Sequence, residues 1–155
     1  MNVRIVVADE REANFFDALN PTAPLTPRGS LVNENGGKKD IELETDRPGQ
    51  RTGGTAGSVE GQHHGVTGEK STEQHELTLF AKEVAKRIDT ERAQNKFDRL
   101  VLVAGPKMLG LLRQSLPTPT QTLIAGEVVK DIVRQGPEVI LKAVPPEAFE
   151  NFRMQ

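Results

Sequence analysis

The hydrophobic positions in the first part of the chain follow the pattern of short β-strands. A β-branched apolar run over residues 3–8 is typical of a strand that is covered on both faces. After a polar turn at residues 9–12, the apolar pattern resumes over residues 13–19 and predicts an antiparallel hairpin partner. Prolines mark the next connection, and residues 29–33 predict a third, short strand. The N-terminal part of the chain is therefore expected to form antiparallel sheet.

Beyond residue 70 the apolar positions change to a helical period. Apolar residues recur at spacings of three and four from residue 77 to residue 88, which predicts an amphipathic helix over residues 72–94. Ser71, followed three residues later by Gln74, predicts a capping box at the start of this helix. On its polar face Glu83 stands four residues before Arg87, which predicts a supporting ion pair.

Strands and helices alternate through the rest of the chain. Residues 100–104 predict a buried strand, and the Gly105-Pro106 pair that follows it starts a helix. Residues 122–125 predict the next strand, and residues 136–144 the last helix. Such alternation implies parallel crossovers, which are almost always right-handed. The predicted fold class is α/β: a mixed five-stranded sheet, with antiparallel N-terminal strands, parallel C-terminal crossovers and helices on its faces.

The segment over residues 46–70 is the exception to these patterns. It holds seven of the fourteen glycines and has very few apolar residues. Such a segment cannot bury enough surface to offset the entropy of ordering it, so it predicts a long Gly-rich loop. Long loops inside compact domains are usually functional or disordered. With 155 residues, the chain is expected to be a single domain, residues 1–155, that presents this loop.

Composition narrows the function classes. The net charge is -2 and the pI is about 6.0, so the chain lacks the overall basic field of many nucleic-acid binders, although a local basic patch stays possible. Cysteine is absent, which removes disulfides, thiolate metal sites and cysteine nucleophiles. The apolar run near the N-terminus is too short for a signal peptide, and no apolar run is long enough to span a membrane. A soluble, cytoplasmic protein is expected.

Histidines and carboxylates are the candidates for metal chemistry. The three histidines, His63, His64 and His75, are close in sequence, but adjacent histidines rarely share one zinc ion, and solvated histidines are the favoured interpretation. Asp9 and Asp131 each follow a predicted strand at its carboxyl end, where they would hold a hydrated magnesium ion in a metal-dependent phosphoester hydrolase. Their alternative role as turn and cap residues is favoured. No cofactor is expected.

Several motifs, taken together and in order, resemble the bacterial "host attachment protein" family. They are Val6-Val7-Ala8-Asp9 with Ala13-Asn14-Phe15-Phe16, then Asp46-Arg47-Pro48-Gly49, the Gly-rich stretch with its histidine, the helix with Phe80-Ala81, Leu102-Val103-Ala104-x-Pro106-x-x-Leu109-Gly110-x-Leu112-Arg113 and Gly126-Glu127-Val128-Val129-Lys130-Asp131. The resemblance covers nearly the whole chain. Each motif is weak alone, and the set is fairly specific.

That family is distantly similar to the middle domain of archaeal and eukaryotic class-one peptide-chain release factors. In those factors a Gly-Gly-Gln loop enters the peptidyl-transferase centre and promotes hydrolysis of peptidyl-tRNA. The resemblance implies a mixed five-stranded sheet with a long Gly-rich loop before the first long helix. This sequence has Gly53-Gly54-Thr55 and, separately, Gly61-Gln62, but no Gly-Gly-Gln. Release activity is therefore not carried over.

The leading hypothesis is a non-catalytic, release-factor-like domain that binds the ribosome, or tRNA or rRNA, in translation or a stress response. The resemblance, and a loop rich in backbone donors and cationic side chains, point to binding by Arg47, Arg51, Gly53, Gly54, Gly61, Gln62, His63 and His64. The metal-dependent hydrolase with Asp9 and Asp131 is one alternative. Host attachment through a surface interaction is another, and the oligomeric state stays open.

Overall fold

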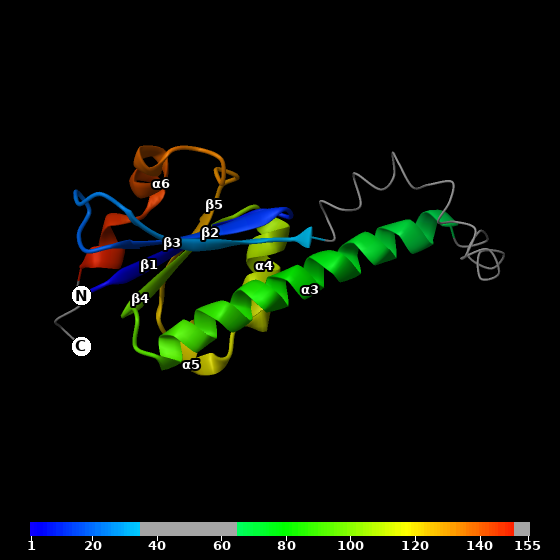
Figure 1. Ribbon diagram of the computed structural model, residues 1–155, viewed down its shortest axis with the longest axis horizontal. Coiled ribbons are helices and arrows are strands. Elements are labelled where there is room, and N and C mark those ends of the chain that lie inside the picture. The colour runs from blue at the N-terminus through cyan, green and yellow to red at the C-terminus, as the bar shows by residue number, and fades with distance from the viewer. Residues whose placement is uncertain (35–64, 151–155) are drawn as a thin grey trace.

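The sheet and its helices form three layers in the computed structural model, which describes residues 1–34 and 65–150 (Figure 1). The five strands lie side by side in the order β3-β2-β1-β4-β5. The pairs β1–β2 and β2–β3 are antiparallel, whereas β1–β4 and β4–β5 are parallel. The predicted fold class is confirmed. The strands are β1 (Val3–Ala8), β2 (Glu12–Ala18), β3 (Thr26–Val32), β4 (Arg99–Ala104) and β5 (Ile124–Val129).

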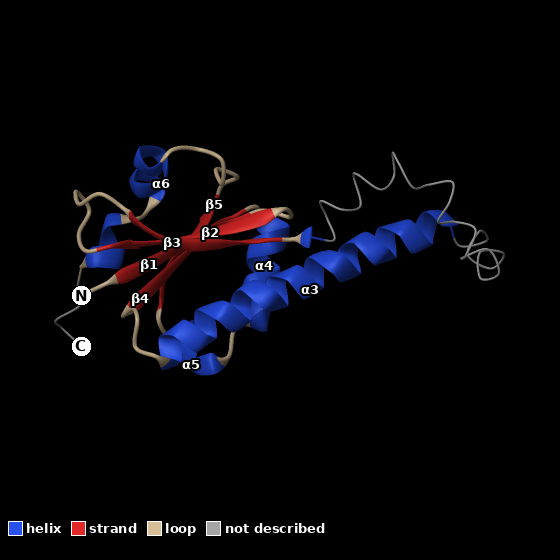
Figure 2. Ribbon diagram, viewed as in Figure 1, coloured by secondary structure: helices blue, strands red, loops and turns tan. Residues whose placement is uncertain are grey.

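Helices cover both faces of the sheet (Figure 2). One face packs against α3 and α4, with the short α5 beside them, and the other against α6 and the 3-10 helix η1. Both crossovers into the parallel strands β4 and β5 pass through helices on the same face. The helices are α3 (Gly65–Ala93), α4 (Pro106–Ser115), α5 (Thr118–Gln121), α6 (Pro137–Ala143) and η1 (Pro146–Phe149).

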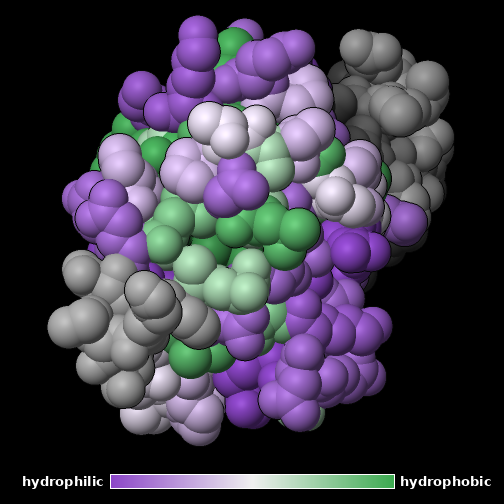
Figure 3. All heavy atoms as spheres, turned by 90° about the vertical axis from the view of Figure 1, so that its left-hand side faces the viewer, coloured by the Kyte–Doolittle hydropathy of each residue, from purple (hydrophilic) through white to green (hydrophobic). Residues whose placement is uncertain are grey.

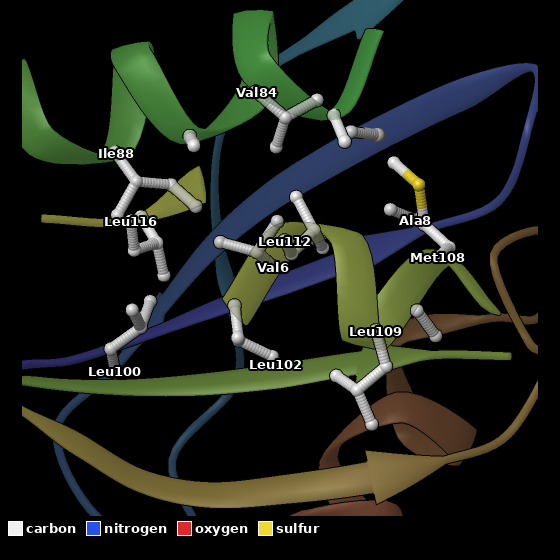
Figure 4. Close-up of a cluster of buried hydrophobic side chains, with 14 of the residues drawn as sticks. Val6, Ala8, Val84, Ile88, Leu100, Leu102, Met108, Leu109, Leu112 and Leu116 are labelled. Carbon is white, nitrogen blue, oxygen red and sulfur yellow. The ribbon is translucent and has the colours of Figure 1, made fainter. Parts of the chain in front are cut away.

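The larger core lies between the sheet and the pair α3 and α4 (Figure 4). Val84 and Ile88 of α3 meet Leu112 of α4 above the side chains of Val6 and Leu102 from the two central parallel strands. All five side chains are fully buried. The apolar spacings that predicted the helices therefore mark the surfaces that they bury against the sheet.

A second core fills the opposite face of the sheet. Val3, Ile5 and Val7 of β1 point into it and pack with Ile140 of α6 and Val144 at the C-cap of that helix. Successive side chains of a strand point to opposite faces, so a strand with helices on both sides needs apolar residues at nearly every position. This requirement explains the apolar run of β1, every residue of which is buried.

The long helix begins earlier than its sequence pattern predicted. α3 starts at Gly65, so residues 65–70, the last part of the predicted loop, are helical, and Ser71 lies inside the helix rather than at its cap. The capping box predicted with Gln74 is therefore wrong. Extending an existing helix adds one hydrogen bond per ordered residue without a new nucleation step, and this gain outweighs the low helix propensity of Gly65 and Gly68. Residues 46–64 lie outside the described residues.

Two strand boundaries also differ from the prediction. β3 starts at Thr26 and includes Pro27. An edge strand tolerates proline, which has no backbone N–H, because one side of such a strand has no partner that needs a donor. β5 starts at Ile124 and continues to Val129, so the strand predicted over residues 122–125 was placed too early and ended too soon. The reason is α5, whose last turn includes Thr122 as its C-cap residue.

The C-terminal end of α3 closes with a Schellman motif. Asn95 adopts a left-handed conformation with φ 58, a conformation that asparagine tolerates better than most residues. Its N–H donates to the carbonyl of Arg92 over 2.9 Å, and the N–H of Lys96 donates to the carbonyl of Glu91 over 3.0 Å. This motif ends the helix and holds the backbone of Lys96 next to the Glu91 turn.

The two ends of α3 have different surroundings. A helix of 29 residues is about 43 Å long at 1.5 Å per residue, and Figure 1 shows its N-terminal part extending beyond the sheet. Residues 72–75 are exposed, whereas regular burial starts at Phe80. The C-terminal half is therefore part of the core, and the N-terminal half forms an arm.

Removing the side chain of Leu102 tests the larger core. Leu102→Ala is expected to lower the free energy of unfolding by about 2–5 kcal/mol, because it leaves a cavity under α4. Leu19→Ala is the matched control, since Leu19 is 65% exposed, and it should change that free energy by less than about 0.5 kcal/mol. Chemical denaturation measures both, and equal effects of the two substitutions would contradict this packing.

Candidate functional site

Asp9 and Asp131 line one cleft at the carboxyl ends of the parallel strands. The cleft has a volume of about 310 Å³ and lies where β1 and β5 end and α4 begins. The placement at the strand ends that the sequence suggested for these two carboxylates agrees with the structure. Lys107 on the first turn of α4 and Leu77 from α3 also line the cleft.

The carboxylate of Asp9 is engaged in the turn between β1 and β2. Its Oδ1 accepts hydrogen bonds from the N–H groups of Arg11, over 2.7 Å, and Glu12, over 2.9 Å. This is the local turn geometry that aspartate favours. Among residues 1–34 and 65–150, no three histidine or carboxylate side chains gather as a group that would hold a metal ion. Glu10, Asp131 and Lys107 line the cleft together with Asp9. Because its carboxylates do not gather as a metal-binding group, they are a poor set for a magnesium ion.

The remaining sequence candidates are dispersed. A further carboxylate next to a strand, Asp98 just before β4, lies at the opposite end of the sheet. Its Oδ2 accepts the N–H of Asn2 over 2.7 Å, so it does not join Asp9 and Asp131. His75 is exposed on α3. All eight residues proposed for partner binding lie outside the described residues. They are Arg47, Arg51, Gly53, Gly54, Gly61, Gln62, His63 and His64.

A buried ion cluster at the amino end of β1 was not predicted. Arg4 is only 2% exposed, and its Nε donates to Oδ1 of Asp17 on β2 over 2.5 Å. Its Nη1 donates to Oε1 of Glu91 on α3. Its Cζ lies over the ring of Phe97, 5.0 Å from the ring centroid. One buried side chain thus joins two strands, the long helix and the connection that follows the helix.

Arg28 and Arg87 extend this cluster to the sheet edge. Arg28 donates from Nε to Oδ2 of Asp17 over 2.8 Å. Arg87 pairs with Glu91 over 3.3 Å, not with Glu83 as its spacing predicted, and stacks 4.2 Å from the ring centroid of Phe15. The reason for the difference is tertiary, because this orientation also lets Arg87 bond to the backbone of β3.

The edge strand β3 is shaped around the Arg87 guanidinium. Arg87 donates to the carbonyl of Arg28 over 2.5 Å and to that of Ser30 over 3.5 Å. Between these two carbonyls Gly29 has a φ of 104, and a Cβ there would lie 2.8 Å from Nη2 of Arg87. Only glycine combines this backbone conformation with such a close approach. Arg87 therefore fastens β3 to α3 and occupies outward carbonyl groups of the edge.

The ionisation of Asp17 depends on these arginines. Burial acts to raise the pKa of Asp17, but hydrogen bonds from Arg4, Asn2 and Arg28 outweigh it and hold the pKa below the ordinary value of 3.8. Asp17 therefore stays charged in the folded protein at neutral pH. A charge inside otherwise apolar strands, at Arg4 and Asp17, was the sequence signal that could have indicated a buried pair.

A second anchor fixes the same half of α3. Thr120 of α5 donates from its hydroxyl to Oδ1 of Asp89 over 2.5 Å, and Arg92 pairs with Asp89 over 3.0 Å. The Thr120 hydrogen bond lowers the pKa of Asp89, and Arg92 acts in the same direction. The C-terminal half of α3 is thus held on one side by the Arg4 cluster and on the other by α5.

The outward side of α3 carries a line of exposed side chains. His75, Leu79, Lys82 and Lys86 follow spacings of three and four, so they share one side of the helix, opposite its buried residues. Two of these residues are lysines. We call this line the outer stripe of α3. It leads from the anchored half of the helix towards Gly65.

The fold and these sites define a three-layer α/β domain that projects the N-terminal part of one long helix. Comparison with known proteins places the chain more closely. It belongs to the family described as "protein required for attachment to host cells", whose family model matches residues 4–144. A stretch of 66 residues is 33% identical to an uncharacterized protein of Rickettsia prowazekii (strain Madrid E). That match covers 41% of this chain and 44% of the Rickettsia protein, less than half of its length.

None of the helices within residues 1–34 and 65–150 combines the length and apolar character needed to cross a bilayer.

Acid titration tests the charge of Asp17. A carboxylate whose folded pKa is depressed stabilises the protein above its unfolded pKa and loses that contribution as the pH falls through the folded value. The wild type is therefore expected to be more stable than Asp17→Asn at neutral pH, and this difference should narrow as the pH falls below 3.8. Denaturant unfolding over a pH series measures it. A difference that stays constant down to the acid limit would show that Asp17 is not held ionised by its arginines.

Proposed function

We propose that this domain is a non-catalytic, cytoplasmic binding module that contacts ribosomal RNA or tRNA. The contact is made by the Gly-rich segment over residues 46–64, with Arg47, Arg51, His63 and His64 as its cationic side chains. Consecutive backbone N–H groups at glycines can cradle phosphate oxygens, and cationic side chains add electrostatic attraction. The resemblance of the sequence to release-factor middle domains motivates this choice of partner.

The observation that carries the proposal is the placement of α3. The Gly-rich segment joins the chain at Gly65, the first residue of a helix whose opposite half is fixed by two polar anchors and a buried apolar face. The N-terminal half extends beyond the sheet (Figure 1). A helix held at one end in this way carries its other end, Gly65, beyond the sheet.

The outer stripe adds a second contact surface on the same helix. Lys82 and Lys86 are exposed and lie one helical turn apart, a rise of about 6 Å. They lie on the same side of the helix as His75. Phosphate contacts by such lysines orient a protein on a nucleic acid without reading its sequence. This role does not require a net positive charge on the whole chain.

The cleft with Asp9 and Asp131 gives weaker support to a hydrolase. One carboxylate oxygen of Asp9 is used by its own turn, and Lys107 lies beside the pair. A metal-dependent phosphoester hydrolase would need further oxygen ligands from water or substrate. Binding without catalysis is the better supported function.

Ribosome cosedimentation at a series of salt concentrations tests the proposal. Binding is expected at low salt and should weaken steeply as salt rises, because phosphate contacts release counterions. The double variant Lys82→Glu/Lys86→Glu should bind less tightly, and the slope of log affinity against log salt should decrease by about 0.7–0.9 per lost contact. Arg47→Glu/Arg51→Glu should reduce binding in the same way.

The matched control is Lys130→Glu/Lys142→Glu, which makes the same charge change at exposed lysines outside α3. It should bind like the wild type. Absence of cosedimentation at low salt, including in extracts of stationary-phase cells, would refute the proposal. If Lys82→Glu/Lys86→Glu and the control variant lose equal affinity, the outer stripe is not a specific contact.

Attachment to host cells is a second candidate, because the description of the family names it. It requires the protein, or a partner that it controls, to act at the cell surface. Fractionation of intact cells measures this, and recovery of the protein from the cytosol alone would exclude a direct adhesive role.

A further inference from the structure

A cavity opens beside the buried ion cluster, at the end of α3 opposite Gly65. It has a volume of about 340 Å³ and is lined by Arg4, Asp17, Arg28, Glu91 and Lys96. These residues come from three adjacent strands, from the last turns of α3 and from the Schellman motif. This end of the molecule faces the viewer in Figure 3, where hydrophilic side chains surround a smaller hydrophobic area.

The two carboxylates of the cavity are neutralised from within the protein. Oδ1 of Asp17 pairs with Nε of Arg4 over 2.5 Å, and its Oδ2 pairs with Nε of Arg28 over 2.8 Å. Oε1 of Glu91 pairs with Arg4, and its Oε2 pairs with Arg87. Every carboxylate oxygen thus faces a guanidinium, so neither acid presents an unpaired charge to an entering anion.

Two cations retain donors towards the opening. Arg28 is about half exposed and uses only Nε for Asp17 within the described residues, which leaves the terminal nitrogens of its guanidinium. Lys96 is exposed, its backbone is fixed by the Schellman motif, and its ammonium group has no ion pair within residues 1–34 and 65–150. With Arg4, three cations face two carboxylates, so one positive charge is in excess.

We infer that this cavity binds a phosphate group, held by Arg28 and Lys96 against the positive field of Arg4. The planar guanidinium of arginine donates two parallel hydrogen bonds to phosphate oxygens, and lysine supplies a compact point charge. The phosphate belongs either to a small anion or to the backbone or terminus of an RNA, which present the same oxygens. The inference stands independently of the ribosome-binding proposal, because free phosphate alone tests it.

A purely structural cluster would not need Lys96. Burying Arg4 with two carboxylates costs desolvation energy, and apolar residues of similar volume often stabilise a core equally well. The inner pairs fasten α3 to the sheet, but Lys96 and the terminal nitrogens of Arg28 add nothing to that fastening. Both line the same opening, where they are available to bind an anionic ligand.

Titration of the intact chain with inorganic phosphate, at constant ionic strength with chloride as the reference salt, tests this pocket. Backbone amide signals of Arg28 and Lys96 in NMR spectra should shift in a saturable way. Lys96→Gln and Arg28→Gln should each weaken phosphate binding by about tenfold, the loss expected for a charged hydrogen bond. Arg28→Gln also removes a partner of Asp17 and can destabilise the fold. If that variant is unstable, the phosphate affinity of Lys96→Gln tests the pocket.

The matched controls are Lys142→Gln and Arg134→Gln, which alter exposed cations elsewhere, and they should bind phosphate like the wild type. No saturable shift in the wild type, or equal weakening in the controls, would overturn the pocket. A short RNA with a 5′-phosphate is then compared with its 5′-hydroxyl form and with free phosphate. Tighter binding of the phosphorylated RNA identifies a nucleic-acid phosphate as the ligand, and equal or weaker binding identifies a small anion.

Discussion

The buried guanidinium of Arg4 is the interaction on which the arrangement of this domain depends. It bonds to Asp17 on β2 and Glu91 on α3 while its Cζ lies over the ring of Phe97, so it joins the sheet to the end of the long helix. A buried charge is stable only with its partners in place, and removing one partner leaves an uncompensated charge. The cluster therefore fixes the C-terminal end of α3 on the sheet in addition to the apolar core.

The same constraint links the two ends of α3. At its C-terminal end, the Arg4 cluster and the Asp89–Thr120 contact hold the helix, and the leftover cations there form the phosphate pocket that we infer. At the other end the helix leaves the sheet and leads to the Gly-rich segment. One helix is thus anchored to the sheet at its C-terminal end and joined to the Gly-rich segment at its N-terminal end. The cleft at the strand carboxyl ends is separate from the Arg4 cluster. One of its carboxylates, Asp9, accepts the hydrogen bonds that shape the turn after β1.

Much of the fold could be predicted from the sequence, because burial leaves a direct pattern. The apolar run of β1 and the spacing of Phe80, Val84 and Ile88 follow from which faces are covered. The start of α3 was missed because helix extension through Gly65 and Gly68 has no apolar signature. The ion cluster was missed because Arg4 and Glu91 are 87 residues apart, and only the tertiary fold brings them together. Asp9 and Asp131 could be placed together from the sequence because each follows a strand at its carboxyl end. The hydrogen bonds of Asp9 within its turn were visible only in the structure.

Hydrogen–deuterium exchange along α3 tests the central claim that the ion cluster anchors one half of this helix and leaves the other half as an arm. The account predicts that amides of residues 80–93 exchange much more slowly than those of residues 65–79. It also predicts that Glu91→Gln accelerates exchange in the slow half, because Arg4 loses a charged partner. Uniform protection along the helix, or a Glu91→Gln profile identical to the wild type, would contradict it.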